Sequence, residues 1–265
     1  MDSGYKGLVL TLALALPIAA WCSSNPPCGG PTDLLSIIDR PTIADSVCLV
    51  PNKSIVMESG YQHLSLLGGG TQQNFPEALL RFGLADEFEF NILLPNYIHQ
   101  NILPYTGYQA TVMGVKHQIG SSSEWVTVID GYVILPSGTA NFGSERIGGI
   151  VNGLFGYNFT SEINLSGMLG VSSQTQSINE GGMRFTSVNP ALVLSWSKEK
   201  VSVYWEIYGQ SKPSPEDNAG LNTDAGVIYL IKKNIAIDLE AGQRINGSLG
   251  GFSHFWGAGI SIQFS

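Results

Sequence analysis

The chain has 265 residues, of which 43% are hydrophobic and only 13% are charged, and its formal net charge is −8. A soluble domain carries about 25% charged residues, so this composition argues against intrinsic disorder and against an ordinary water-solvated surface. The acidic balance also argues against nucleic acid as a partner, because phosphate binding needs a basic face.

The first 22 residues have the pattern of a secretory signal peptide. A lysine precedes an apolar stretch at residues 8–20, which is too short to span a bilayer, and small residues follow it. We expect cleavage after Cys22, with lipidation of Cys22 as the alternative, and we exclude this segment from the fold. No later stretch is apolar enough over 18 residues to form a membrane-spanning helix.

Residues 23–53 form a separate N-terminal segment. Asp33 to Asp39 is expected to form a short helix that is capped by Thr32 or Asp33, and Pro41 ends it. The apolar side chains of this helix must be buried, and two locations remain open. The segment either enters the barrel as a plug or packs as a periplasmic tail on the rim.

Two cysteines, Cys28 and Cys48, lie at either side of this helix. An oxidising periplasm allows them to pair, so we expect a disulfide in preference to two free thiols. Closing such a loop contributes on the order of 3 kcal/mol in the chain-entropy model. The sequence has neither a CxxC motif nor a nearby histidine pair, so we expect no metal site.

In residues 54–265, apolar residues alternate with polar or small residues over strand-length segments, which predicts β-strands. The segments are 54–67, 75–84, 87–95, 107–119, 124–136, 147–159, 162–173, 184–196, 201–210, 220–231, 234–245 and 254–264. In the last segment, one face carries Trp256, Ile260 and Phe264, and the other is small. Segment 107–119 is ambiguous, because neither Lys116 nor His117 can be assigned to a face.

In the five segments with the clearest alternation (87–95, 147–159, 201–210, 234–245 and 254–264), the apolar faces contain no charge, and the polar faces are rich in Gly, Ser and Asn with scattered acids. A soluble β-sandwich would place Lys and Glu on its outer face, whereas a membrane barrel places its apolar face against lipid. Short and long connections also alternate, which is typical of an up-and-down barrel with both termini in the periplasm. We therefore predict an all-β fold: a closed antiparallel transmembrane β-barrel of about twelve strands in the bacterial outer membrane. A soluble all-β domain is the alternative.

Several short motifs recur in one order along the chain. They are IDRPT at residues 38–42, VP at 50–51, ESGY at 58–61, RFGL at 81–84 followed by Glu87 and Glu89, GVKH at 114–117 and LPSG at 135–138. In these motifs the chain resembles the bacterial outer-membrane family described as the MetA pathway of phenol degradation. The resemblance implies a porin-like transporter and not an enzyme.

By strand parity, a set of charged side chains is expected to line the lumen: Glu77, Arg81, Glu89, Asp130, Glu206, Asp224, Asp238, Glu240 and Arg244. These groups either line a path, favouring a cation or a neutral solute, or pair with one another and fill the barrel. The predicted function is passive passage of small, aromatic or hydrophobic solutes. A structural or surface-interaction barrel without transport is the alternative.

A third hypothesis is a membrane lipid hydrolase, since His63 and Ser65 lie two residues apart on one face of the first strand. His99, His117 and His254 stand apart and are expected in loops or at the rim. No GxxxxGK, HExxH or GxSxG pattern occurs, so we expect no cofactor. The expected partners are outer-membrane lipid and a small-molecule solute. Nothing in the sequence demands an oligomer, so we expect a monomer.

Overall fold

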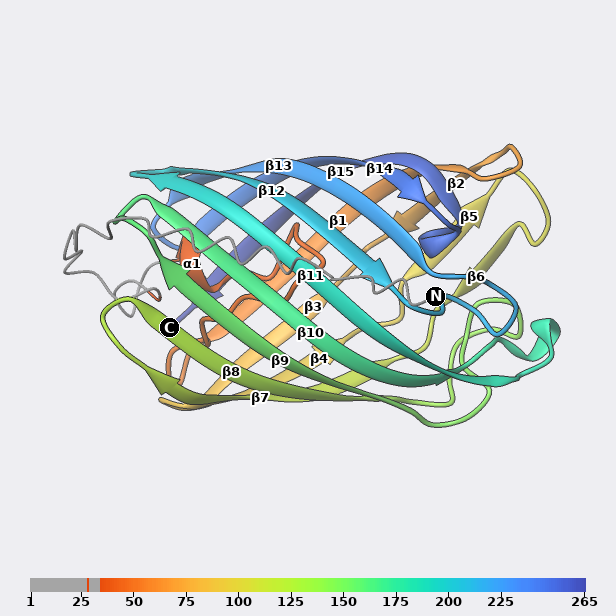
Figure 1. Ribbon diagram of the computed structural model, residues 1–265, viewed down its shortest axis with the longest axis horizontal. Coiled ribbons are helices and arrows are strands. Elements are labelled where there is room, and N and C mark those ends of the chain that lie inside the picture. Colours follow the sequence, from red (N-terminus) through yellow and green to blue (C-terminus); the bar gives the residue numbers. More distant parts are fainter. Residues whose placement is uncertain (1–27, 29–33) are drawn as a thin grey trace, which may run out of the picture.

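The alternating segments form antiparallel strands that close into a ring in the computed structural model, which describes Cys28 and residues 34–265 (Figure 1). The predicted signal peptide and the expected caps of the helix lie outside the described residues. The helical elements are α1 (Leu34–Ile37), η1 (Ile178–Glu180) and η2 (Leu249–Gly251). The strands are β1 (Ile55–Leu66), β2 (Thr71–Phe75), β3 (Leu79–Ala85), β4 (Phe88–Leu93), β5 (Tyr97–Gln100), β6 (Thr106–Tyr108), β7 (Val112–Ser121), β8 (Trp125–Ile134), β9 (Gly148–Asn158), β10 (Ile163–Thr175), β11 (Arg184–Lys198), β12 (Val201–Gln210), β13 (Gly220–Lys232), β14 (Ile235–Asn246) and β15 (Phe252–Phe264).

The barrel closes because β1 pairs with β15, so the wall has no free edge. The sheet has 15 segments, but β2 continues into β3, β4 into β5 and β6 into β7, which gives the predicted twelve crossings of the wall. Pro76 and Pro95 lie in the first two breaks. Proline has no backbone N–H to donate, so strand pairing is interrupted there.

Strands β2 and β5 lie where the sequence pattern indicated loops. β2 reads Thr-Gln-Gln-Asn-Phe and is polar on both faces over most of its length, so it shows no alternation. It nevertheless pairs with β1 on one side and β5 on the other. The wall of the barrel therefore extends further along the barrel axis at β2 and β5 than the alternating apolar pattern predicts.

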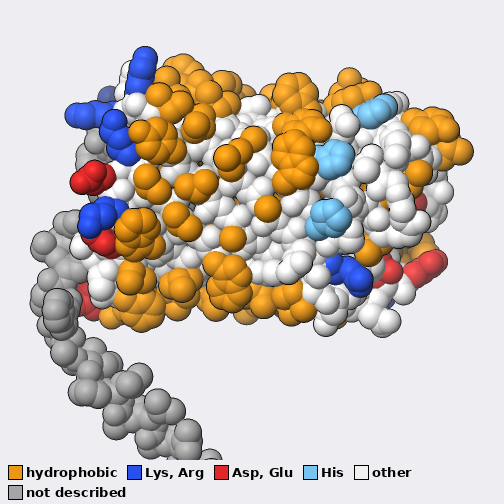
Figure 2. Space-filling model, turned by 90° about the horizontal axis from the view of Figure 1, so that it is seen from above, with side chains coloured by type: hydrophobic (Ala, Val, Ile, Leu, Met, Phe, Trp, Pro, Cys, Tyr) orange, Lys and Arg blue, Asp and Glu red, His pale blue; other side chains and the backbone are white. Residues whose placement is uncertain are grey.

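Side-chain directions follow the predicted parity, and hydrophobic side chains cover the outer wall (Figure 2). Leu239 is 59% exposed on β14, whereas its neighbour Asp238 is 3% exposed inside the barrel. The ambiguous strand β7 is also resolved. Lys116 points inward and is fully buried, while His117 lies on the outward face and stacks on Phe88 with ring centroids 4.2 Å apart.

The N-terminal segment lies inside the barrel, where the red and orange trace runs in Figure 1. Leu34, Ile37 and Val50 pack against inward-facing apolar residues of the wall, among them Val126 and Val128. Burying each such side chain contributes roughly 1.5 to 3 kcal/mol. Of the two open locations the segment therefore occupies the lumen, and its helix is the single turn α1 rather than the longer helix expected from residues 33–39.

The two ends of the barrel differ. Connections such as 199–200 and 233–234 are tight turns, whereas 135–147, 176–183 and 211–219 are longer. Outer-membrane barrels place their short turns in the periplasm and their longer loops outside, so α1 and Phe264 lie toward the periplasmic end. No helix among the described residues is long and apolar enough to cross a membrane.

Candidate functional site

A fully buried arginine joins the wall to the N-terminal segment. Arg81 extends inward from β3, and its Nε lies 2.6 Å from Glu89 Oε1 on β4. Its Nη1 lies 3.2 Å from Glu58 Oε1 on β1 and 3.1 Å from Asp39 Oδ1 of the segment. The guanidinium also donates to the carbonyl oxygens of Ile37 and Cys48. Arg81 therefore binds two wall carboxylates and three groups of the segment.

Lys116 makes a second buried link from β7. Its Nζ lies 3.2 Å from Asp39 Oδ1 and donates to the carbonyl of Ser46 at 3.0 Å. The same Asp39 oxygen accepts the Ser46 amide at 2.7 Å. Burial raises the pKa of Asp39 to about 7, and the nearby Arg81 and Lys116 oppose that rise. One aspartate of the segment thus lies between two cations of the wall.

Wall carboxylates accept backbone amides of the segment. Glu58 accepts Asp39 N at 3.1 Å and Arg40 N at 2.7 Å. Glu206 on β12 accepts the amides of Ile43 and Ala44, both at 2.8 Å. Glu89 accepts Val50 N at 2.6 Å. Such charge-assisted bonds satisfy both the buried carboxylate and the buried amide. We call the segment held in this way, residues 34–54, the plug.

Arg40 of the plug reaches three predicted lumen acids. It lies 2.7 Å from Glu77, 3.4 Å from Asp238 and 3.6 Å from Glu240. Gly60, on β1, makes this possible, because a Cβ built there would lie 2.3 Å from Arg40 Cζ. These acids therefore bind a cation of the plug instead of lining an open path.

The other predicted lumen residues pair with no cation or backbone amide of the plug among the described residues. Asp130 faces inward, accepts the Asn152 amide at 2.8 Å and interacts with the carboxyl group of Asp45 on the plug. Asp224 is 3% exposed, and neither of its oxygens has a hydrogen-bond partner among the described residues. Arg244 is exposed near the loop end of β14, where it donates to the Gly247 carbonyl at 3.1 Å. It lies away from the charged cluster that the other residues build.

The sequence reasoning missed five participants: Glu58 and Lys116 on the wall, and Asp39, Arg40 and Asp45 on the plug. Asp45 joins the plug to β8, because it accepts the Tyr132 hydroxyl at 2.9 Å. Strand parity could have found Glu58, which shares a face with the inward-pointing Val56. The three plug residues lie in irregular backbone, where no periodicity indicates a direction.

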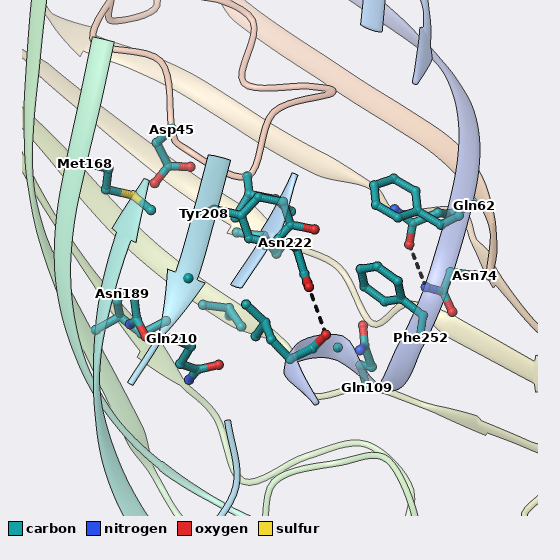
Figure 3. A pocket seen from close by; sticks show the side chains of 18 of the residues that line it. Asp45, Gln62, Asn74, Gln109, Met168, Asn189, Tyr208, Gln210, Asn222 and Phe252 are labelled. Carbon is teal, nitrogen blue, oxygen red and sulfur yellow. Dashed lines mark hydrogen bonds between the residues drawn. The ribbon is translucent and has the colours of Figure 1, made fainter. Parts of the chain in front are cut away.

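Above the plug, a cavity of about 510 Å³ lies on the side of the outer loops (Figure 3). We call it the vestibule. Its polar lining is mainly carboxamide: Gln62, Gln72, Asn74, Gln109, Asn152, Gln174, Asn189, Gln210 and Asn222. Leu64, Phe252 and Phe255 make an apolar side. The plug supplies Ile43 and Asp45, and Asp45 is the one charged residue among the described lining residues.

A smaller cavity of about 140 Å³ lies on the periplasmic side of the plug. Ser197 and Ser202, next to the tight turn between β11 and β12, line it together with Leu35 and Ser36 of the plug. Residues of the plug touch both cavities, so the plug separates the vestibule from the periplasmic end.

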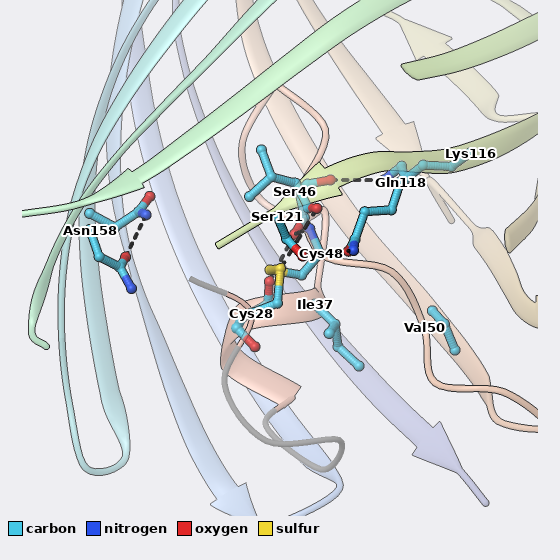
Figure 4. Close-up of a disulfide and its surroundings, with 12 residues drawn as sticks. Cys28, Ile37, Ser46, Cys48, Val50, Lys116, Gln118, Ser121 and Asn158 are labelled. Carbon is cyan, nitrogen blue, oxygen red and sulfur yellow. Dashed lines mark hydrogen bonds between the residues drawn. A yellow bond between two sulfur atoms is a disulfide. The ribbon is translucent and has the colours of Figure 1, made fainter. Parts of the chain in front are cut away.

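A disulfide joins Cys28 to Cys48, with their Cα atoms 5.2 Å apart (Figure 4). Cys48 is 1% exposed within the apolar core of the plug, and its carbonyl is bound by Arg81. The bond spans a sequence separation of 20 residues and ties Cys28, which precedes the plug, to Cys48 within it.

Comparisons with known proteins agree with this architecture. The family model described as "Putative MetA-pathway of phenol degradation" matches residues 39–263, which include most of the plug. No curated protein matches the chain.

Three solved structures share the fold. The COG4313 outer membrane channel from Pseudomonas putida F1 is 10% identical, with a TM-score of 0.65 over 81% of this chain and 96% of that one. The NanC porin is 10% identical, with a TM-score of 0.55 over 78% of this chain and 98% of that one. The KdgM porin is 11% identical, with a TM-score of 0.54 over 78% and 99% of the two chains.

Proposed function

This chain belongs to the family described as "Putative MetA-pathway of phenol degradation", and from that premise we propose that it is a porin-like outer-membrane channel whose own N-terminal plug closes the lumen. One observation carries the proposal: a vestibule of about 510 Å³ lies on the loop side and has plug residues in its lining. A solute can enter from outside and be held there, and it passes when the plug moves.

The lining of the vestibule suits a small neutral solute that has both hydrogen-bonding and apolar groups. Carboxamides donate and accept hydrogen bonds without a net charge. The apolar side, with Phe252 and Phe255, suits an aromatic or aliphatic portion of the same solute. Asp45 adds a negative charge that no described lining lysine or arginine offsets, so a cation passes more readily than an anion.

Transport of this kind needs no covalent chemistry in the lumen and no second subunit. The inward carboxylates Glu58, Glu89 and Glu206 are occupied by amides and cations of the plug. Pairing of β1 with β15 closes the wall within one chain. We therefore propose a monomeric passive channel.

Liposome swelling tests the proposal. The probes are three solutes of similar size: a neutral phenyl glycoside, an amine-bearing analogue and a carboxylate-bearing analogue. We expect the neutral and cationic probes to enter faster than the anionic one, and a variant lacking residues 29–47 to admit all three faster than wild type. Equal, background-level swelling for wild type and this variant, with the barrel folded, would overturn the channel.

The same closed lumen supports a second candidate, a structural or surface-interaction barrel that transports nothing. Its supporting observation is that Arg81 and Lys116 fix the plug by buried ion pairs, which resist displacement. Swelling that stays at background after deletion of residues 29–47 would favour this second function.

A further inference from the structure

A chain of three polar side chains lies on the outer wall at the seam where β1 meets β15. Ser65 and His254 are directly opposite each other in the register of this strand pair. Ser65 Oγ lies 3.0 Å from His254 Nε2, and His254 Nδ1 lies 3.1 Å from Ser253 Oγ. The structure thus pairs Ser65 with His254 and not with His63, which stacks on Trp256 instead.

The hydrogen bonds determine which of the three side chains donates a proton to which. Ser253 Oγ lies 3.1 Å from the carbonyl oxygen of Ser65, and it can only donate there because a carbonyl carries no proton. Its single proton is then used, so it accepts Nδ1–H from His254. The Nε2 of the neutral imidazole is therefore free to accept the Ser65 hydroxyl proton. This is the order of nucleophile, general base and orienting group.

The side chains of Ser65, His254 and Ser253 face the membrane and not the lumen. Leu64 and Phe255, the strand neighbours of Ser65 and His254, are buried and line the vestibule on the other face of the wall. Histidine side chains gather on the outer wall beside the hydrophobic band (Figure 2). The wall of the barrel therefore separates these three side chains from the lumen.

The height of Ser65 on the wall matches the outer interface of the bilayer. It lies ten residues beyond Ile55 on β1, and a strand rising about 3.3 Å per residue at about 45° climbs roughly 23 Å over that span. Just below it, Trp256 packs with Tyr61 at 5.6 Å between ring centroids. Aromatic residues mark the interface of such barrels, where lipid ester carbonyls meet water.

The turn that follows Ser65 borders open space. A Cβ added at Gly68 or Gly69, in the turn directly after β1, would meet no atom within 4 Å. No side chain therefore crowds these two positions, three and four residues after the serine.

We propose that Ser65 is the nucleophile of an esterase site on the outer wall, with His254 as general base and Ser253 as its positioning residue, and that its substrate is a carboxylic ester of an outer-leaflet lipid. Ser65 Oγ forms a bond to the ester carbonyl carbon while its proton moves to His254 Nε2. The carbon–oxygen bond to the alcohol then breaks, and His254 returns the proton to the leaving alcohol. Water next attacks the acyl group on Ser65 and gives a proton to His254. The acyl–serine bond breaks, the fatty acid leaves, and Ser65 regains its proton.

Labelling and hydrolysis test this site. The folded full chain in detergent micelles is treated with a fluorescent alkyl fluorophosphonate, and the labelled peptide is identified by mass spectrometry. Hydrolysis is measured with a p-nitrophenyl ester of a medium-chain fatty acid in micelles and with a fluorescent diacyl phospholipid in vesicles. We expect label on Ser65 and release of fatty acid by wild type.

Ser65→Ala and His254→Ala are expected to lose hydrolysis by on the order of 100-fold or more, as for removal of a nucleophile or general base. Ser253→Ala is expected to lower kcat more than KM and to shift the pH profile, which a merely structural residue would not do. His99→Ala is the matched control, because it removes another exposed histidine on β5. It should leave the rate unchanged.

All variants are purified in parallel and checked for the folded barrel by heat-modifiable gel migration. Two results together would overturn the site. They are the absence of label on Ser65 in wild type, and a wild-type rate of hydrolysis no higher than that of Ser65→Ala for both esters. Hydrolysis of the p-nitrophenyl ester alone would support the serine–histidine chemistry and overturn the lipid as its substrate.

Discussion

Glu206 holds the part of the plug that closes the vestibule, so its removal should open the channel. Its two oxygens accept the amides of Ile43 and Ala44, each at 2.8 Å. A charge-assisted hydrogen bond contributes about 1.5 to 3 kcal/mol, so Glu206→Ala weakens docking of this tip by about 3 to 6 kcal/mol. Even 3 kcal/mol shifts a two-state equilibrium roughly 150-fold. We expect a higher mean single-channel conductance in planar bilayers, or frequent opening events.

The matched control for this experiment lies on the next strand. Asp224 on β13 is directly opposite Glu206 in the register and is equally buried, but its oxygens have no hydrogen-bond partner among the described residues. Asp224→Asn should therefore leave conductance at the wild-type level. Conductance of Glu206→Ala that equals wild type, in a barrel shown to be folded, would refute the role of this carboxylate in holding the tip.

Three other changes test other parts of the plug and vestibule. Gly60→Val should displace the Arg40 guanidinium, since even a Cβ there would lie 2.3 Å from it; protease cleavage within the plug should then become faster. Replacing Cys28 and Cys48 by serine should remove on the order of 3 kcal/mol of stability from the plug, measured by the denaturant concentration at which the plug becomes cleavable. Asp45→Asn should reduce the cation preference, seen as a reversal potential closer to zero in a salt gradient.

Each of these changes has its own control. Gly167→Ala is the control for Gly60, because the nearest atom to a Cβ at Gly167 is 3.6 Å away and the plug contributes none of the nearby atoms. Adding reductant to wild type should reproduce the cysteine variant. Asp224→Asn should leave the reversal potential unchanged, since Asp224 is not among the described residues that line the vestibule and its charge interacts with Glu206 and Glu240 rather than with Asp45.

Strand parity was sufficient to predict the barrel, because lipid on one side of the wall demands an uncharged apolar face on every crossing. The same argument placed Glu206 and Asp238 inside. The argument failed for β2, because this strand lies in a part of the wall beyond the apolar band. A strand there needs no alternation of apolar and polar side chains. The argument also could not pair Ser65 with His254, because the register that closes the barrel joins residues 189 positions apart. The alternation within the first strand identified only His63 as a partner for Ser65.

The plug partners were unpredictable for a different reason. Asp39 and Arg40 lie in irregular backbone, so no pattern in the sequence states which wall residue each will meet. The sequence indicated a helical turn, paired thiols and buried apolar residues in this segment. The position of the segment within the lumen follows only from contacts between distant parts of the chain, such as the one between Arg40 and Asp238.

The contacts of the plug divide it into a fixed base and a releasable tip. The base has buried apolar side chains such as Leu34, ion pairs with two cations of the wall and a disulfide. Moving it would expose apolar surface and take Asp39 away from the buried Arg81 and Lys116. At the tip, Ile43 is 48% exposed, the amides of Ile43 and Ala44 bind Glu206, and Asp45 accepts the Tyr132 hydroxyl at 2.9 Å. In the channel that we propose, a solute in the vestibule contacts Ile43 and Asp45 of the tip and not Leu34 or Cys48 of the base. Opening of the proposed channel therefore requires only a local rearrangement of the tip, and the wall of the barrel can stay folded.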